Sequence, residues 1–279
     1  EQSWGVGDFA DLALLASTVG AVGADYLLIN PVHAAEPVPP IEDSPYLPTS
    51  RRFVNPLYIS VEAVPEYASL DGAALKEMEE LAAPLKALNQ TAEPLDRDRV
   101  FAAKLLALRE LFHLSMADDA RRGAFETFCE DEGVGLREFA HWCAAQAAES
   151  EHEGAPRHEA GDDIEELVQF YMWLQFVADE QRRVAQDAAV GAGMSIGIMT
   201  DLAVGIHPGG ADAATLGSVL VPDASVGAPP DQYSQQGQDW SQPPWNPFGL
   251  AADGYGPWRD LLRTVLRHSG GIRVDHILG

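Results

Sequence analysis

The stretch that decides the fold is residues 270–279, which read GGIRVDHILG. Polar and apolar residues alternate along it, and a period of two is typical of a β-strand. In a strand, Arg273 and Asp275 point to one face, and the residues between and beside them point to the other. We therefore expect a strand over about 271–277 with a guanidinium and a carboxylate side by side near its carboxyl end.

This pair of side chains has two interpretations. A guanidinium held beside a carboxylate favours the ionised form of that carboxylate. At the carboxyl end of a barrel strand, an ionised carboxylate is suited to act as the nucleophile of a glycosidase-type reaction. The other interpretation is a structural ion pair at a strand end, and residues 270–279 taken alone favour it. The rest of the sequence has to decide.

The composition is that of a globular protein with an acidic surface. Of its 279 residues, 46% are hydrophobic, and the formal net charge is -25. This charge argues against nucleic acid and anionic membranes as partners, because both need a basic surface. No apolar run approaches the length of a membrane span. Cys129 and Cys143 lack a metal-type spacing, so we expect buried free thiols in a reducing compartment, which indicates the cytoplasm.

The first part of the chain, residues 1–59, reads as helix, strand and loop. Apolar residues recur at helical spacing over 8–23, with Asp8 as the expected N-cap. A short apolar strand follows at about 25–31, and such a strand is typical of a parallel sheet covered on both faces. Prolines are frequent over 34–58, which predicts a long loop, and long loops inside a domain are usually functional.

The middle region, residues 60–190, is predicted to be helical. Ala, Leu, Glu, Arg and Gln dominate it, and helical periodicity runs through much of its length. A charged break over 148–161 is predicted to be a solvated loop. The longest helix should follow, at about 162–189.

The strand pattern returns in the last region, residues 191–279. We expect a strand at about 194–204, a loop of some fifty residues, a helix at about 256–269 and the final strand. The loop mixes aromatic rings with amides and carboxylates, and this combination suits sugars: rings stack on a pyranose and polar groups bind its hydroxyls. An ordered surface loop pinned down by its tryptophans is the alternative.

Several stretches, in order and spacing, carry a resemblance to a known family. They are SWGVGD at 3–8, DSPY at 43–46, NPLY at 55–58, WLQF at 173–176 with DEQ at 179–181, GIMTDLAVG at 197–205, VGAPPD at 226–231, GQDW at 237–240 and RVDH at 273–276. Together they resemble the 4-α-glucanotransferases called amylomaltases or disproportionating enzymes, within the α-amylase superfamily. The residues of these motifs most resemble the bacterial maltodextrin-type branch of the family.

The resemblance implies an α/β fold, an incomplete (β/α)8 TIM barrel with a large helical insertion. Residues 1–59 would be the first barrel part, 60–190 the insertion, and 191–279 the second barrel part. It also implies a retaining mechanism. Asp275 would attack the anomeric carbon of an α-1,4-glucan, and Arg273 would hold Asp275 in place.

The resemblance further implies a set of substrate-binding residues. Tyr46 would stack beside the reacting sugar, Trp240 would shape the acceptor side, and Asp201 would position hydroxyls or support the loops. The full set is Ser44, Tyr46, Asn55, Asp201, Asp231, Tyr233, Gln238, Trp240 and His276. No cofactor or metal is expected. The partners would be maltooligosaccharides and starch- or glycogen-derived glucans, with no nucleic acid and no membrane.

The family pattern contains parts that this chain is expected to lack. Retaining chemistry needs a second carboxyl group as acid and base. In this family it is a glutamate after the next strand, which would lie beyond Gly279, and the first barrel strand would precede Trp4. We therefore expect an internal fragment of a larger enzyme that is inactive by itself.

Three alternatives to the glucanotransferase stay open. A related α-glucan hydrolase would pass the glycosyl group to water instead of a sugar. A non-catalytic sugar-binding fragment would bind glucans without reacting. A metal-dependent barrel enzyme could use Asp201, His207 and Asp275, although no paired histidine spacing favours it.

Overall fold

The computed structural model describes residues 2–150, 164–221 and 223–276, which fall into two compact units. The helical unit is drawn from residues 1–25, 37–41 and 55–195, and the sheet unit from 26–36, 42–54 and 196–279. The chain passes between the two units several times, so neither is a continuous stretch. The three-part division expected from the sequence stays a prediction.

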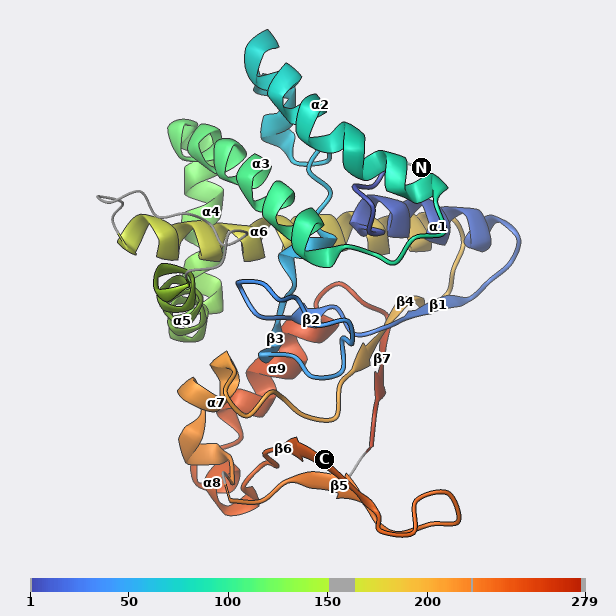
Figure 1. The fold of residues 1–279 in the computed structure, drawn as a ribbon, viewed down its shortest axis with the longest axis vertical. Helices are drawn as coiled ribbons and strands as arrows, with labels where there is room; N and C mark the ends of the chain where they lie inside the picture. Colours follow the sequence, from blue (N-terminus) through green and yellow to red (C-terminus); the bar gives the residue numbers. More distant parts are fainter. Residues whose placement is uncertain (1, 151–163, 222, 277–279) are drawn as a thin grey trace. The chain divides into compact units, whose positions relative to one another are not determined.

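The helical unit contains six α-helices within the described residues. They are α1 (Phe9–Ala21), α2 (Gly72–Lys86), α3 (Arg97–Ala117), α4 (Asp119–Glu132), α5 (Val134–Glu149) and α6 (Ile164–Gly191), with 3-10 turns at Pro56–Tyr58, Pro65–Ser69 and Ala87–Gln90. The expected helices at 8–23 and 162–189 correspond to α1 and α6 (Figure 1). Residues 162–163 and most of the charged segment 148–161 lie outside the described residues.

Helix α1 begins where the sequence predicts. The Asp8 carboxylate accepts hydrogen bonds from the backbone N–H groups of Ala10 and Asp11, at 3.0 and 3.2 Å. The Asp11 side chain in turn accepts from the Asp8 N–H, which completes a capping box. Two otherwise unpaired helix donors are thereby satisfied, and the expected N-cap is confirmed.

Aromatic side chains hold α3 and α6 together in the core of this unit. The rings of Phe112 and Trp173 meet edge to face with centroids 5.8 Å apart, and Phe170 packs against both. Trp173 is fully buried, and its indole N–H donates to the Ser115 hydroxyl at 3.0 Å. Burial of this size dominates core energetics, while the hydrogen bond removes the cost of a buried polar group.

The two cysteines are free thiols in this unit, as expected. Cys143 is buried and Cys129 is half-buried. Burial raises the pKa of the Cys129 thiol to about 12, and Glu126 raises it further. The Cys129 thiol is therefore a poor nucleophile, and Cys143 is a buried packing residue.

The sheet unit is built on a parallel three-stranded sheet in the order β1, β4, β7 (Figure 1). The strands are β1 (Tyr26–Ile29), β4 (Gly197–Leu202) and β7 (Gly271–Val274), which confirms the three strands expected from the sequence with shorter bounds. Strand β7 ends at Val274, but the Asp275 N–H still donates to the Leu202 carbonyl at 3.1 Å. Asp275 therefore lies at the carboxyl edge of this sheet.

The two segments expected to be loops contain regular structure. The segment 34–58 includes β3 (Ser50–Val54), which pairs antiparallel with β2 (His33–Ala34). The later segment includes α7 (Ala211–Thr215), a 3-10 turn (Gly217–Val219), β5 (Val226–Ala228), β6 (Gln238–Gln242) and α8 (Pro247–Ala252), before α9 (Gly256–Leu266). Short strands give little periodicity in the sequence, and the frequent prolines predicted a loop instead of these strands.

No helix within the described part of the chain combines the length and apolar character that crossing a membrane requires.

Two glycines of the helical unit allow a paired test of its packing. Gly20 is buried in α1, and a Cβ there would lie 2.9 Å from the Cβ of Ala192, after α6. Gly20→Ala should lower the free energy of unfolding, because overpacking typically costs about 1–3 kcal/mol and helix propensity returns about 1 kcal/mol or less. Gly123→Ala in α4 meets no atom within 4 Å and should raise stability by about 0.5–1 kcal/mol. Chemical denaturation followed by circular dichroism measures both, and shifts of the same sign would contradict the α1–α6 contact.

Candidate functional site

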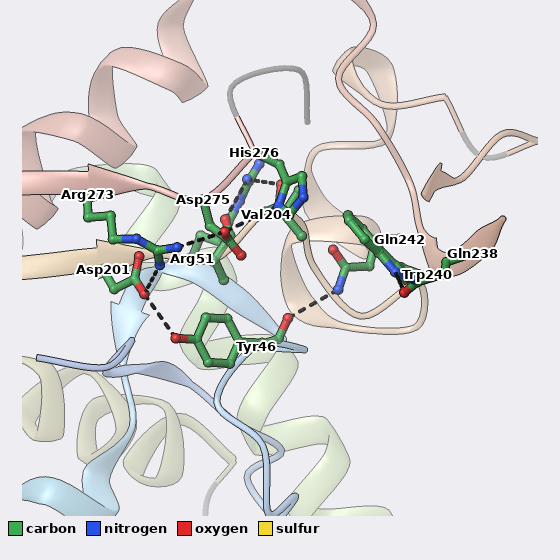
Figure 2. Close-up of polar contacts among 11 residues, drawn as sticks. Tyr46, Arg51, Asp201, Val204, Gln238, Trp240, Gln242, Arg273, Asp275 and His276 are labelled. Carbon is green, nitrogen blue, oxygen red and sulfur yellow. Dashed lines mark hydrogen bonds and ion pairs between the residues drawn. The ribbon is translucent and has the colours of Figure 1, made fainter. Parts of the chain in front are cut away.

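Three charged side chains meet where β4 and β7 end. Asp201 and Arg273 are register partners across the two strands, so their side chains share a face. The Arg273 guanidinium donates to Asp201 Oδ2 at 2.5 Å and to Asp275 Oδ1 at 3.3 Å (Figure 2). The Asp201 side chain is only 4% exposed, whereas that of Arg273 is 47% exposed. Arg273 therefore joins a buried carboxylate to one that is partly exposed, since the Asp275 side chain is 19% exposed.

Tyr46 adds a third contact to this group from the 42–54 segment. Its hydroxyl donates to Asp201 Oδ2 at 3.0 Å (Figure 2). Desolvation raises the pKa of Tyr46, and the hydrogen bond to Asp201 raises it further, so the hydroxyl remains a donor. The hydrogen bond to Asp201 likewise raises the pKa of the Arg273 guanidinium, which stays charged.

The turn after β4 is fixed by Arg51 of β3. The Arg51 guanidinium donates to the carbonyls of Ala203 and Val204 at 3.1 and 2.7 Å and lies 5.2 Å from the centre of the Trp245 ring. The Arg51 backbone N–H donates to the Asp212 carboxylate at 2.9 Å. Burial lowers the pKa of Arg51 to about 10 and raises that of Asp212. These contacts hold the turn that follows Asp201.

The hairpin of β5 and β6 supplies aromatic and amide side chains. The Trp240 ring meets the His276 imidazole edge to face, with centroids 4.8 Å apart. Its indole N–H donates to the Gln238 side-chain oxygen at 3.1 Å. A ring nitrogen of His276 lies 3.2 Å from Asp275 Oδ1, and His276 has a left-handed backbone conformation with φ of 50°. This hairpin therefore reaches the carboxylate at the end of β7.

These segments border an open cavity of about 350 Å³ in the sheet unit. It is lined by Ser44, Tyr46, Leu47, Val204, Trp240, Gln242, Asp275 and His276. Asp275 contributes a carboxylate, the two aromatic residues contribute flat apolar faces, and Ser44 and Gln242 contribute uncharged polar groups. Such a mixture suits a ligand that carries both apolar faces and many hydroxyls.

The structure brings most of the predicted site residues together. Ser44, Tyr46, Trp240, Asp275 and His276 line the cavity. Behind them, Asp201 and Arg273 connect to this lining through Tyr46 and Asp275, and Gln238 connects through Trp240. Their proposed roles in binding and catalysis remain predictions.

Three predicted residues have other positions. The Asn55 side chain is buried and accepts from the Leu57 N–H at 3.0 Å, capping a 3-10 turn of the helical unit. Asp231 accepts from the backbone N–H groups of Tyr233 and Ser234, both at 2.7 Å, and so closes a turn. Tyr233 is 90% exposed. None of the three lines the cavity, and their binding roles stay predictions.

Sequence reasoning missed three lining residues, namely Leu47, Val204 and Gln242. Leu47 and Val204 are apolar neighbours of chosen residues, and no local pattern separates them from core side chains. Gln242 lies two residues after Trp240, but the register is irregular between them, so strand alternation does not identify it either.

The metal-dependent alternative gains no support from the described residues. Across 2–150, 164–221 and 223–276, no three His, Cys, Asp or Glu side chains are grouped so as to hold a metal ion. His207 instead receives a hydrogen bond on Nδ1 from the Gly209 N–H at 3.1 Å.

Comparison with known proteins gives consistent matches over the full chain. A family model described as 4-alpha-glucanotransferase matches residues 1–279. The 4-alpha-glucanotransferase of Mycobacterium tuberculosis (strain ATCC 25618 / H37Rv) is 46% identical over 296 residues, covering 100% of this chain and 40% of that protein. The 4-alpha-glucanotransferase of Haemophilus influenzae is 33% identical, covering 100% of this chain and 44% of that protein.

Solved structures agree with the sequence matches. The crystal structure of amylomaltase from Corynebacterium glutamicum superposes with a TM-score of 0.93 at 59% identity, covering 99% of this chain and 39% of that one. Amylomaltase from Streptococcus agalactiae in complex with acarbose has a TM-score of 0.76 at 16% identity, covering 98% and 56%. The second likeness shows the fold alone. This chain spans about 40% of the length of the Mycobacterium relative.

The Asp201–Arg273 pair should respond unequally to loss of either partner. Within the described residues, Arg273→Met leaves the buried Asp201 carboxylate with the Tyr46 hydroxyl as its one hydrogen-bond donor, which should lower the free energy of unfolding by about 1–3 kcal/mol. Asp201→Asn leaves a half-exposed guanidinium that water can solvate, so the loss should be less than half as large. Thermal and chemical denaturation of both variants measure the difference. Equal losses would contradict the burial of Asp201.

Proposed function

This chain belongs to the 4-alpha-glucanotransferase family, glycoside hydrolase family 77, and from this premise we propose the activity of the whole protein. It transfers an α-1,4-glucan segment from a donor maltodextrin to the 4-hydroxyl of glucose or of another maltodextrin. The observation that carries the proposal is the group formed by Asp275, Arg273, Asp201 and Tyr46 beside an aromatic-lined cavity.

In the proposed mechanism, Asp275 is the nucleophile of a retaining double displacement. A carboxylate oxygen bonds to the anomeric carbon as the glycosidic bond breaks, and the leaving sugar oxygen takes a proton from a second carboxyl group. The acceptor 4-hydroxyl then gives its proton to that group and displaces Asp275, so two inversions retain the configuration. Asp275 already lies at the cavity wall, which favours this role.

The second carboxyl group is assigned from the family resemblance. Retaining enzymes place their two carboxyl groups about 5–5.5 Å apart. Asp275 is the carboxylate that the described cavity lining contains. We therefore assign the acid and base to a glutamate after the next strand of the whole protein.

The surrounding side chains divide into positioning and binding roles. Arg273 fixes the nucleophile through its bond to Asp275, and its orientation is in turn fixed by Asp201. Tyr46 and Trp240 offer ring faces to the sugars, with Trp240 on the acceptor side. The remaining proposed binding residues are Ser44, Asn55, Asp201, Asp231, Tyr233, Gln238 and His276. The ligands are maltooligosaccharides and starch- or glycogen-derived glucans.

The fold proposed with this function is a (β/α)8 barrel. Strands β1, β4 and β7 are neighbouring parallel strands in chain order, which supports their being consecutive barrel strands. Residues 60–190 would be a helical insertion between the barrel parts 1–59 and 191–279. The candidate site lies at the carboxyl ends of β4 and β7, where barrel enzymes place their chemistry.

Two other functions remain distinct from this proposal. A hydrolase would use the same nucleophile with water as the acceptor, and a non-catalytic fragment would bind glucans without turnover. Residues around Trp240 would decide between transfer and hydrolysis, because they shape the side on which the acceptor binds. Family membership favours transfer.

Product analysis tests transfer against hydrolysis in the whole protein. Incubation with maltotriose should yield glucose and a ladder of longer maltodextrins, and reducing ends should stay nearly constant because each transfer conserves one glycosidic bond. Chromatography and a reducing-sugar assay follow both quantities. A steady rise in reducing ends without a ladder would identify a hydrolase instead, and no products would identify a binding protein.

Asp275→Asn tests the nucleophile. The amide keeps the shape of the side chain but cannot form the glycosyl–enzyme bond, so glucose release from maltotriose should fall by several orders of magnitude. Maltodextrin binding, measured by calorimetry, should be largely kept. Turnover within about tenfold of the unsubstituted protein would remove Asp275 from the mechanism, because that is a barrier change of only about 1.4 kcal/mol.

A further inference from the structure

Gln242 combines burial with an incompletely satisfied polar group. The residue is 5% exposed and ends β6 at the cavity wall. Its side-chain N–H donates to the Tyr46 carbonyl at 3.1 Å (Figure 2). Its Oε1 is buried and has no hydrogen-bond partner within the described residues. Such an acceptor is costly, so the position of this amide calls for a physical reason.

The unpaired oxygen packs against the backbone of Gly205. A Cβ at position 205 would lie 2.5 Å from the Gln242 Oε1 and 2.8 Å from the Gln242 Cβ. Side-chain atoms do not approach this closely, so Gly205 must lack a side chain for Gln242 to sit here. The turn after β4, which also carries Val204 of the cavity lining, is therefore in direct contact with the amide.

A bulge in β6 connects Gln242 to Trp240. The register steps from Gly227 opposite Asp239 to Val226 opposite Gln242, so Trp240 and Ser241 have no register partner. Ser241 has a left-handed φ of 57°, and its N–H donates to the Asp239 carboxylate at 2.8 Å. Bulges of this kind redirect side chains, and a strained residue within one persists only where its surroundings hold it in place. The Asp239 carboxylate supports the first end of the bulge, and Gln242 lies at its second end.

Gln242 thus contacts or borders three segments of the cavity wall. It is bonded to Tyr46, packed on the Gly205 turn and joined through the bulge to Trp240. Its hydrogen bond and its close packing are with the walls of the cavity, whereas the Asp275 side chain contacts Arg273 and His276. Gln242 is therefore placed to control the spacing of the walls without itself contacting the nucleophile.

We propose that Gln242 is a positioning residue that sets the separation of Tyr46 and Trp240 across the sugar-binding cavity. The inference rests on the proposed function, since it assigns the cavity to glucan. Loss of the amide weakens the contacts of the Tyr46 and Trp240 rings with the sugar. Substrate affinity falls, and the chemical step at Asp275 is largely kept.

The first test compares two glutamines of the whole protein. Gln242→Met keeps the length of the side chain and removes its N–H donor. It should raise the KM for maltotriose about 5- to 10-fold with kcat within about threefold, the size expected for one lost hydrogen bond. Gln146→Met in α5 is the matched control and should change neither constant. Unchanged KM in Gln242→Met, or a loss of kcat alone, would overturn the inference.

The second test uses a shape-matched variant and covers the case in which Gln242→Met fails to fold. Gln242→Glu presents a carboxylate to the Tyr46 carbonyl at neutral pH and regains an O–H donor when protonated. The ratio of its KM to that of the unsubstituted protein should therefore fall towards one at about pH 5, near the range where glutamates titrate. Asp275 and His276 line the same cavity in both proteins, so their contributions cancel in the ratio. A ratio independent of pH would contradict the hydrogen bond to Tyr46.

The third test approaches the same contact from Gly205. Gly205→Ala should displace Gln242 and raise KM, whereas Gly217→Ala, with no atom within 4 Å, should not. The effects of Gly205→Ala and Gln242→Met should not add in the double variant, because both break one contact. Full additivity would overturn the inference.

If the unsubstituted protein transfers no glucan, the proposed function itself fails. That result is distinguishable from a failure of the inference about Gln242, in which the unsubstituted protein is active.

Discussion

The buried carboxylate of Asp201 is the constraint on which the site depends. A charge with 4% exposure is tolerated only beside a compensating cation and hydrogen-bond donors. Arg273 provides the cation because β4 and β7 pair in a register that sets the two residues opposite each other. Once Arg273 is drawn to Asp201, its second nitrogen lies beside Asp275. The nucleophile proposed here is therefore placed by the satisfaction of a neighbouring charge.

The same constraint organises the segments around the sheet. Tyr46 comes from the 42–54 segment and is held by its bond to Asp201, so the aromatic wall of the cavity is tied to the strand ends. Arg51 fixes the turn that follows Asp201 through two backbone carbonyls. Polar contacts of this kind specify geometry more than they add stability. They explain how a sheet of three short strands can support a defined cavity.

The cavity wall formed by the β5–β6 hairpin is held in a different way. The β5–β6 hairpin has no large core of its own, and its key residues lie on a bulge in which Ser241 takes a left-handed conformation. A strained bulge keeps its shape only where its surroundings hold it. Asp239 holds it locally, and burial of the Gln242 amide against Gly205 holds it to the sheet. The position of Trp240 is thereby set by contacts at both ends of the bulge.

The sequence by itself determined the strands β1, β4 and β7, the N-cap of α1, the long helix α6, and the family. These depend on local periodicity, capping chemistry and motif order, all of which are written in adjacent residues. It also indicated Asp275 and Arg273 as neighbours, because alternation in one strand is enough to show it. Tertiary structure alone decided that Arg273 bonds to Asp201, that the proline-rich segments contain paired strands, and that Gln242 faces Gly205. Each of these joins residues far apart in the chain, so its energy comes from burial and partners that no local pattern records.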